Sequence, residues 1–368
     1  MGVGGDARCV LVESRKEFRH TAILPSPAPT PEFQLAFLTK IEELLARGKF
    51  TSTYKFALLI ALTNIAVENG NDTNDTLEIK LDDVARQYLA LYWSMARPYP
   101  RVNAILNQTT NTERRATIIT MLEEEARHAQ SSYQRLRVHR TLRDALVGEA
   151  RKTLAKDVLY RLQTVGGTHD TAPTCEKFLY DHPQTAAQCA KLKRITLEPG
   201  TAACLRRLRG VIIAMVQARW ALFVRENNVQ LSVDRELESF LFGATRSAVS
   251  LYAARFYDLQ EGRCFYSGDK LVGPERGEVD HFIPWARYPF DSPFNLVLAS
   301  RRVNNKMRDD LKPPEWRERW LRRNEDCVAA LIAPAPNGFG AEEADRTVVR
   351  SVAAWIYREA IGNRSLPQ

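Results

Sequence analysis

Apolar positions over the first hundred residues recur mostly with the period of a helix. The pattern predicts helices over residues 32–48 and 53–68, and then a half-buried strand at Leu77–Leu81, where apolar and charged side chains alternate. The next segment is amphipathic and stops before Pro98, with one apolar face made of Val84, Tyr88, Leu91, Tyr92 and Met95.

Helical patterning continues through the middle of the chain and returns at its end. We expect helices over residues 117–163, 201–226 and 233–257, and a last helix over residues 341–360. Residues 168–200 lack a sustained period and predict a loop-rich segment. The N-terminal two-thirds of the chain is therefore expected to be mainly α-helical.

The pattern changes after residue 258. Glu278–Ile283 predicts a strand that runs into Pro284, and Asn295–Ala299 predicts the returning strand. A short helix is expected from Asn304 through Leu311, ended by the prolines that follow. The order is thus strand, long loop, strand, helix.

The expected fold is mainly α with a small C-terminal α+β module. We place a leader of uncertain fold at 1–30, a mainly helical region at 31–250, the α+β module at 251–325 and a C-terminal helical extension at 326–368. Helix, helix, strand, helix over 31–98 is compatible with a winged-helix-like DNA reader, and equally with plain helical scaffolding.

Charge adds a preference for polyanions. The chain has 368 residues, a net charge of +8 and a pI of about 9.2, which favours nucleic acid over a membrane as partner. Arginine clusters at 206–209, 301–302 and 317–323 are dense enough to hold phosphates.

Cysteine use and hydropathy bear on the compartment. The six cysteines are scattered without a CxxC pair, which favours a reducing environment. No run of eighteen apolar residues and no signal peptide is evident. We therefore expect a cytoplasmic protein that is not bound to a membrane.

The α+β module concentrates groups suited to phosphodiester hydrolysis. His281 is the only histidine between residues 258 and 312, and a neutral imidazole can accept a proton from water. Asp280 and Asn304 supply oxygen ligands, which Mg²⁺ or Mn²⁺ prefers. We expect His281 to be the general base and the other two to be metal ligands.

Asp280–His281, Asn295 and Asn304, spaced along two strands and a helix, resemble the HNH endonuclease family, whose nuclease domain has the ββα-metal fold. The resemblance implies an HNH nuclease domain at 251–325 that cuts double-stranded DNA to 5′-phosphate products. It implies that Asn295 braces the loop between the strands and orients the base. The phosphate-binding candidates are Arg301 and Arg302, just before the expected short helix, and Lys306 and Arg308 within it.

The helical region also resembles what precedes such domains in stand-alone bacterial HNH proteins. Those proteins serve in restriction or anti-phage defence, so partner proteins of a defence system are expected to bind the helical region. Two alternatives remain open: an RNA-directed nuclease or nickase with the same centre, and a catalytically silent nucleic-acid-binding or scaffolding protein.

The sequence departs from the family at the zinc knuckle. Many HNH proteins carry two CxxC pairs, but here the first reads Cys264-x-x-Ser267 and the second Ser300-x-x-Val303. One thiol of four cannot hold zinc, so no structural zinc is expected. We expect apolar packing in its place, by Phe265, Tyr266 and Val303.

Two further features lie beyond the second strand. The family's usual lysine near the helix start is out of register, because Met307 occupies its place. Trp316 and Trp320 are expected in the core, although base stacking is an alternative, and the arginines interleaved with them are expected to face the DNA backbone.

Overall fold

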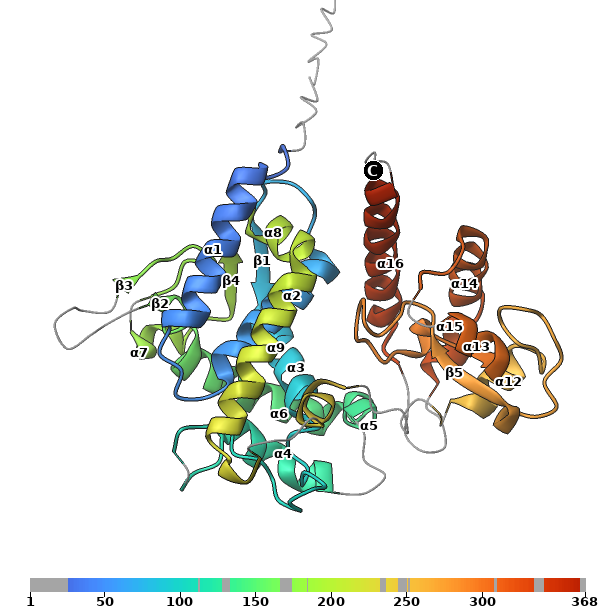
Figure 1. Cartoon of the computed structure of the whole chain (residues 1–368), viewed down its shortest axis with the longest axis horizontal. Helices are drawn as coiled ribbons and strands as arrows, with labels where there is room; N and C mark the ends of the chain where they lie inside the picture. Colours follow the sequence, from blue (N-terminus) through green and yellow to red (C-terminus); the bar gives the residue numbers. More distant parts are fainter. Residues whose placement is uncertain are drawn as a thin grey trace, which may run out of the picture.

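The computed structural model describes residues 26–111, 113–127, 133–165, 174–183, 185–231, 236–243, 250, 252–307, 310–333 and 341–364. The chain is helix-rich, with a helical N-terminal region, a small ββα module towards the C-terminus and a long last helix between them (Figure 1). The predicted fold class is confirmed. Most of the predicted leader, residues 1–25, lies outside the described part.

The N-terminal region begins with α1 at Pro31, where Thr30 accepts a hydrogen bond from Phe33 N at 3.3 Å, as a helix cap does. Its helices are α1 (Pro31–Arg47), α2 (Tyr54–Asn69), α3 (Leu81–Tyr92), α4 (Thr117–Arg127), α5 (Tyr133–Val138), α6 (Arg140–Thr153), η1 (Leu154–Val158), α7 (Ala186–Cys189), α8 (Thr201–Arg207), α9 (Arg209–Glu226), η2 (Val229–Leu231) and α10 (Leu237–Phe242).

Helix α2 is the centre of this region. Every residue from Tyr54 to Val67 is buried, and α3, α8, α9 and the C-terminal α16 (Glu343–Arg364) pack around it. A helix that is apolar on all sides needs such a complete cover. The two predicted helices at 32–48 and 53–68 therefore form, with boundaries within a residue of those expected.

Two of the three arginines at 206–209 are buried, so the prediction that this cluster holds phosphates is wrong for Arg206 and Arg209, whereas Arg207 is exposed. The Arg206 side chain is 2% exposed and donates to the carbonyl oxygens of Ala66, Val67 and Gly70, at the end of α2. Carbonyls at the end of a helix run out of intrahelical donors. Ala66 O still accepts from Gly70 N at 2.9 Å, and the internal guanidinium supplies the further donors.

Three predicted helices are shorter than the sequence pattern indicated. The one at 117–163 divides into α4, α5, α6 and η1, and the one at 201–226 breaks at Leu208, between α8 and α9. The helix predicted over 233–257 includes α10, which ends where Gly243 adopts an extended backbone, and α12 (Ala253–Leu259). The sequence pattern did not reveal these breaks, because apolar residues at helical spacing lie on both sides of each one.

The loop-rich prediction for residues 168–200 missed a strand. β4 (Arg194–Leu197) pairs antiparallel with β1 (Leu77–Lys80), so the partner of β1 lies more than a hundred residues further along the chain. A second short pair joins β2 (Thr164–Val165) to β3 (Thr174–Cys175).

The C-terminal module has the predicted order of elements. β5 (Gly277–His281) pairs antiparallel with β6 (Leu296–Ser300), and α13 (Arg301–Met307) packs on both strands. The short helix begins at Arg301, three residues earlier than predicted. The remaining elements are η3 (Pro274–Arg276), η4 (Pro293–Asn295), α14 (Pro314–Asp326) and α15 (Val328–Ile332).

Two apolar cores correspond to the two regions. The larger one fills the helical region, and the smaller one joins β5, β6, α12, α14 and α16. Helix α16 links them, because it packs on α2 and its Ser351 hydroxyl donates to Glu68 O at 2.9 Å. Of the helices in the described ranges, none combines the length and the apolar character needed to cross a bilayer.

Candidate active site

The β5–β6 pair positions the two residues of the Asp-His dipeptide. Asp280 lies opposite Val297 and His281 opposite Leu296, and β5 ends at His281. Consecutive side chains on a strand point to opposite faces. The structure accordingly gives Asp280 and His281 different neighbours.

Asp280 is held by two groups from outside the strand pair. Its Oδ2 accepts a hydrogen bond from the Tyr266 hydroxyl at 2.6 Å and lies 3.6 Å from Lys312 Nζ. Burial, reinforced by the Asp280 charge, raises the pKa of Tyr266 well above its usual range, so this phenol stays protonated and keeps donating. The Lys312 side chain is fully buried, which places an ammonium group inside the protein beside the carboxylate.

Asn304 reaches the same face of β5 as Asp280. Its Nδ2 donates to Glu278 Oε2 at 2.9 Å, and Glu278 stands two residues before Asp280 on the strand. Residues two apart on a strand share a face. Helix α13 therefore brings the second expected metal ligand to the side of the sheet that carries the first.

His281 is paired with a carboxylate that the sequence pattern had not indicated. Its Nε2 lies 2.7 Å from Asp291 Oδ1, and its ring packs on Trp285 with centroids 5.3 Å apart. An ionised carboxylate only accepts hydrogen bonds, so this contact assigns the imidazole proton to Nε2. Nδ1 is then the nitrogen with a lone pair.

Asn295 ties together the loop between the strands. Its Oδ1 accepts from Ile283 N at 2.8 Å, while its Nδ2 donates to Ile283 O at 3.2 Å and to Phe290 O at 3.3 Å. It is 1% exposed. One amide thus joins the segment after His281 to the segment before Asp291.

Three of the four candidate phosphate-binding residues lie in the described part of α13 and are exposed there. Arg301 Nε is 3.5 Å from Glu278 Oε1, and Arg302 Nη2 is 3.6 Å from Asp269 Oδ2. Lys306 is also exposed, and Arg308 lies outside the described residues. These exposed, positively charged side chains thus lie on the same helix as Asn304.

The residues of α14 have internal roles. Trp320 is fully buried and stacks on Phe282 with ring centroids 4.3 Å apart, so the expectation of a core tryptophan is confirmed. The expectation that the neighbouring arginines face DNA is wrong for Arg323, whose Nε and Nη1 are buried, whereas Arg319 is exposed. Arg319 donates to the Phe265 carbonyl, and Arg323 Nη2 donates to Leu296 O at 2.9 Å.

The region of the zinc knuckle is filled by apolar side chains. Phe265, Tyr266 and Val303 all belong to the smaller core. Cys264 Sγ accepts from Ser300 N at 3.3 Å; burial alone would raise the pKa of this thiol, but hydrogen bonds from Ser267 and Ser300 outweigh it and lower the pKa. Across the described ranges, His, Cys, Asp and Glu side chains nowhere gather in a group of three or more that could hold a metal ion.

Sequence reasoning missed the groups that surround the dipeptide. Tyr266 and Lys312 contact Asp280 from segments before and after the strand pair, and Asp291 contacts His281 from the intervening loop. Asp291, ten residues after His281, is the one that a search of the loop for an acidic partner could have found.

Comparisons with known proteins match two separate parts of the chain. Residues 34–239 match a family described as a domain of unknown function (DUF8808), and residues 264–311 match an HNH endonuclease family. The chain matches no curated protein and no solved structure. Because the first match covers more than half of the chain, the protein belongs to the DUF8808 family, and in it this domain is followed by a domain of the HNH endonuclease type.

Proposed function

We propose that the protein is a metal-dependent endonuclease that hydrolyses DNA phosphodiester bonds. The observation that supports this most is the His281–Asp291 pair at the end of β5, within residues that match an HNH endonuclease family. Asp291 holds the Nε2 proton, so Nδ1 accepts a proton from the attacking water. A base held in this way needs no reorientation before it acts.

Asp280 and Asn304 are the proposed metal ligands. Both contacts of Asp280 use Oδ2, so Oδ1 is the oxygen assigned to the metal. The hydrogen bond from Asn304 Nδ2 to Glu278 orients the amide, which assigns Oδ1 to the metal there too. One carboxylate and one amide suit Mg²⁺ or Mn²⁺, because such ions complete their shell with water and substrate phosphate. When bound, the ion stabilises negative charge on the phosphoryl and leaving oxygens.

DNA is the proposed substrate because α13, the helix that carries Asn304, also exposes positively charged side chains. Arg301, Arg302 and Lys306 would contact backbone phosphates, which is a binding mode without sequence readout. The helical domain would position the duplex or partner proteins. A role in restriction or anti-phage defence rests on the resemblance to stand-alone bacterial HNH proteins.

The first test replaces the proposed base. His281→Ala is expected to slow Mg²⁺- or Mn²⁺-dependent cleavage of plasmid DNA by about 100-fold or more, the usual contribution of a general base. EDTA should abolish cleavage by the unchanged protein. The matched control is His139→Ala, because His139 is exposed and lies in the helical region. If His281→Ala cuts as fast as the control while folded, the assignment of the base is wrong.

The second test measures the metal without using activity. Asp280→Asn keeps an acceptor for Tyr266, and Asn304→Ala removes the amide; each is expected to weaken Mn²⁺ binding about tenfold or more in calorimetry, because one hard ligand is lost. Asp258→Ala is the control, since Asp258 is exposed on α12. Unchanged Mn²⁺ affinity in both site variants excludes them as ligands.

A catalytically silent nucleic-acid-binding protein is the second candidate. The buried Lys312 ammonium favours it, because this charge already balances part of the Asp280 carboxylate. Cleavage assays on duplex DNA, on pre-nicked DNA and on RNA separate the candidates. Binding without cleavage of any of the three would favour the silent protein, and cleavage of RNA alone would favour the RNA-directed nuclease.

A further inference from the structure

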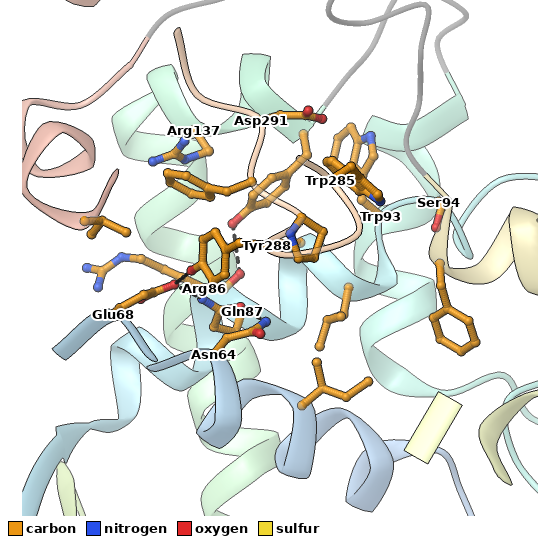
Figure 2. A pocket seen from close by; sticks show the side chains of 18 of the residues that line it. Asn64, Glu68, Arg86, Gln87, Trp93, Ser94, Arg137, Trp285, Tyr288 and Asp291 are labelled. Carbon is orange, nitrogen blue, oxygen red and sulfur yellow. Dashed lines mark hydrogen bonds between the residues drawn. The ribbon is translucent and has the colours of Figure 1, made fainter. Parts of the chain in front are cut away.

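A cavity of about 570 Å³ lies where the helical region meets the loop of the HNH domain. Figure 2 shows side chains of both regions around it, among them Asn64, Gln87 and Trp93 of the helical region and Trp285, Tyr288 and Asp291 of the HNH loop. Its volume is within the range of pockets that bind small molecules. Neither family match assigns a ligand to it.

Three residues that line this cavity each carry a buried polar atom without a hydrogen-bond partner among the described residues. The atoms are Asn64 Oδ1, Trp93 Nε1 and Arg209 Nε, on side chains from residues that are 8%, 7% and 6% exposed. An unpaired buried polar group is destabilising, and native proteins contain few of them, so three such atoms on the residues around one cavity need an explanation. The set offers one acceptor and two donors.

Five arginines line the cavity, and they differ in their partners; Arg97 Nε donates to Ala126 O at 3.1 Å. Arg86, Arg137 and Arg143 form ion pairs with Asp83, Asp345 and Glu342 respectively. Arg209 instead donates Nη1 to Arg287 O at 2.8 Å, and its own Nε is one of the three groups without a partner. A buried cation held this way favours an anionic group in the cavity.

The apolar part of the lining mixes aliphatic side chains, such as Ile60, Leu91 and Ile213, with aromatic ones. The aromatic residues are Trp93, Tyr133, Phe242, Trp285, Tyr288 and Phe290. Flat apolar walls together with an amide, an indole N–H and a guanidinium suit a planar heteroaromatic ring that carries a phosphate. We propose that this cavity binds a nucleotide, either free in solution or extruded from a nucleic acid.

The position of the cavity gives the ligand a route to the proposed base. Asp291, which also lines the cavity, bonds His281, and Trp285 packs on the same imidazole. An occupied cavity contacts the segment 285–291 and changes the cleavage rate. This consequence rests on the proposed nuclease activity, whereas the binding itself does not.

The binding test uses the full chain with His281→Ala, so that it does not depend on catalysis. Calorimetry with AMP, GMP, CMP and UMP, with the matching nucleosides and with inorganic phosphate, measures a free ligand. Trp93→Phe keeps a ring but removes the indole donor and is expected to weaken binding of the preferred nucleotide about tenfold. Trp355→Phe is the matched control, because Trp355 Nε1 is also without a partner and its residue is 8% exposed, but it lies outside the cavity.

A second variant tests the phosphate. Arg209→Met is expected to remove the advantage of the nucleotide over its nucleoside while nucleoside binding persists, which also shows that the cavity is intact. The assignment of the phosphate is wrong if Arg209→Met still prefers the nucleotide over its nucleoside by the same factor as the unchanged cavity.

The second possible source of the ligand, a nucleotide extruded from a nucleic acid, is tested with DNA in the presence of EDTA. Extruding a nucleotide costs least at a mismatch, so a protein that captures one binds a mismatched duplex more tightly than a matched one. That preference should persist in Trp355→Phe and disappear in Trp93→Phe, measured by fluorescence anisotropy. Binding of free nucleotides assigns the ligand to solution, and a mismatch preference alone assigns it to the substrate. The absence of both, or equal effects of the two tryptophan variants, overturns the proposal.

Discussion

At the scale of residues, the proposed catalytic group is a pair. His281 supplies the imidazole, and Asp291 holds one of its nitrogens at 2.7 Å. A carboxylate in this position fixes the tautomer, as the acidic partner of a metal-bound or catalytic histidine does. Asp291 is therefore a positioning residue, acting through His281.

Asp291→Asn tests this role. The carboxamide can donate to Nε2 and thereby move the ring proton to Nδ1, where it blocks the base. We expect kcat for DNA cleavage to fall about 10–100-fold, the usual effect of losing such a partner, while KM stays the same. Asp310→Asn, at an exposed position, is the control. A fall in DNA affinity with unchanged kcat would instead place Asp291 in substrate binding.

At the scale of elements, the loop between β5 and β6 depends on Asn295. Its amide makes three hydrogen bonds to the main chain, and its residue is buried. The resemblance to HNH nucleases implied a brace that orients the base, which is a role in the reaction rate rather than in the fold. The observed contacts indicate that it serves both, because the groups it satisfies are inside the protein.

Asn295→Ala should consequently destabilise the protein as well as slow DNA cleavage. Leaving the buried Ile283 N–H and carbonyl without their Asn295 partner costs roughly 2–4 kcal/mol in the free energy of unfolding, while Phe290 O keeps its hydrogen bond from Ser292 N. Urea unfolding followed by circular dichroism measures the loss. Asn305→Ala, on the exposed side of α13, should change stability little. A variant with wild-type stability but slow cleavage would restore the purely catalytic role.

At the scale of the whole molecule, the helical region and the HNH domain meet through polar contacts. Glu68 of α2 accepts a hydrogen bond from the Tyr288 hydroxyl of the HNH loop and another from Gln87 Nε2 at 3.0 Å. Glu68 lines the cavity, so it is partly accessible although protein surrounds it. Burial raises the pKa of Glu68 to about 7, and the two hydrogen bonds oppose this shift.

This raised pKa predicts how stability depends on pH. The folded protein binds the Glu68 proton more tightly than the unfolded chain, whose pKa is near 4.5, so the contribution is complete below about pH 4.5 and is lost as pH rises through about 7. The total is at most roughly 3 kcal/mol, and less where water in the cavity screens the charge. Glu68→Gln should remove this part of the pH dependence, measured by urea unfolding across that range. Parallel stability curves for the two proteins would exclude Glu68 as the group responsible.

Much of the architecture follows from local pattern. The helices α1, α2, α3 and α16 and the strand–loop–strand–helix order were predicted because their apolar periodicity lies within each segment. The residue types of the proposed centre, Asp280, His281, Asn295 and Asn304, were also visible, since the spacing along two strands and a helix is itself a local feature.

Tertiary structure decided the rest, because it joins segments that no sequence period connects. It pairs β4 with β1, places Arg206 under the end of α2, and brings Asp291 and Lys312 to the Asp-His dipeptide. It also assembles the cavity, whose unpaired groups come from three separate helical segments. A side chain's partners across the fold depend on how the chain packs, and packing is decided by the complete set of contacts rather than by any one segment.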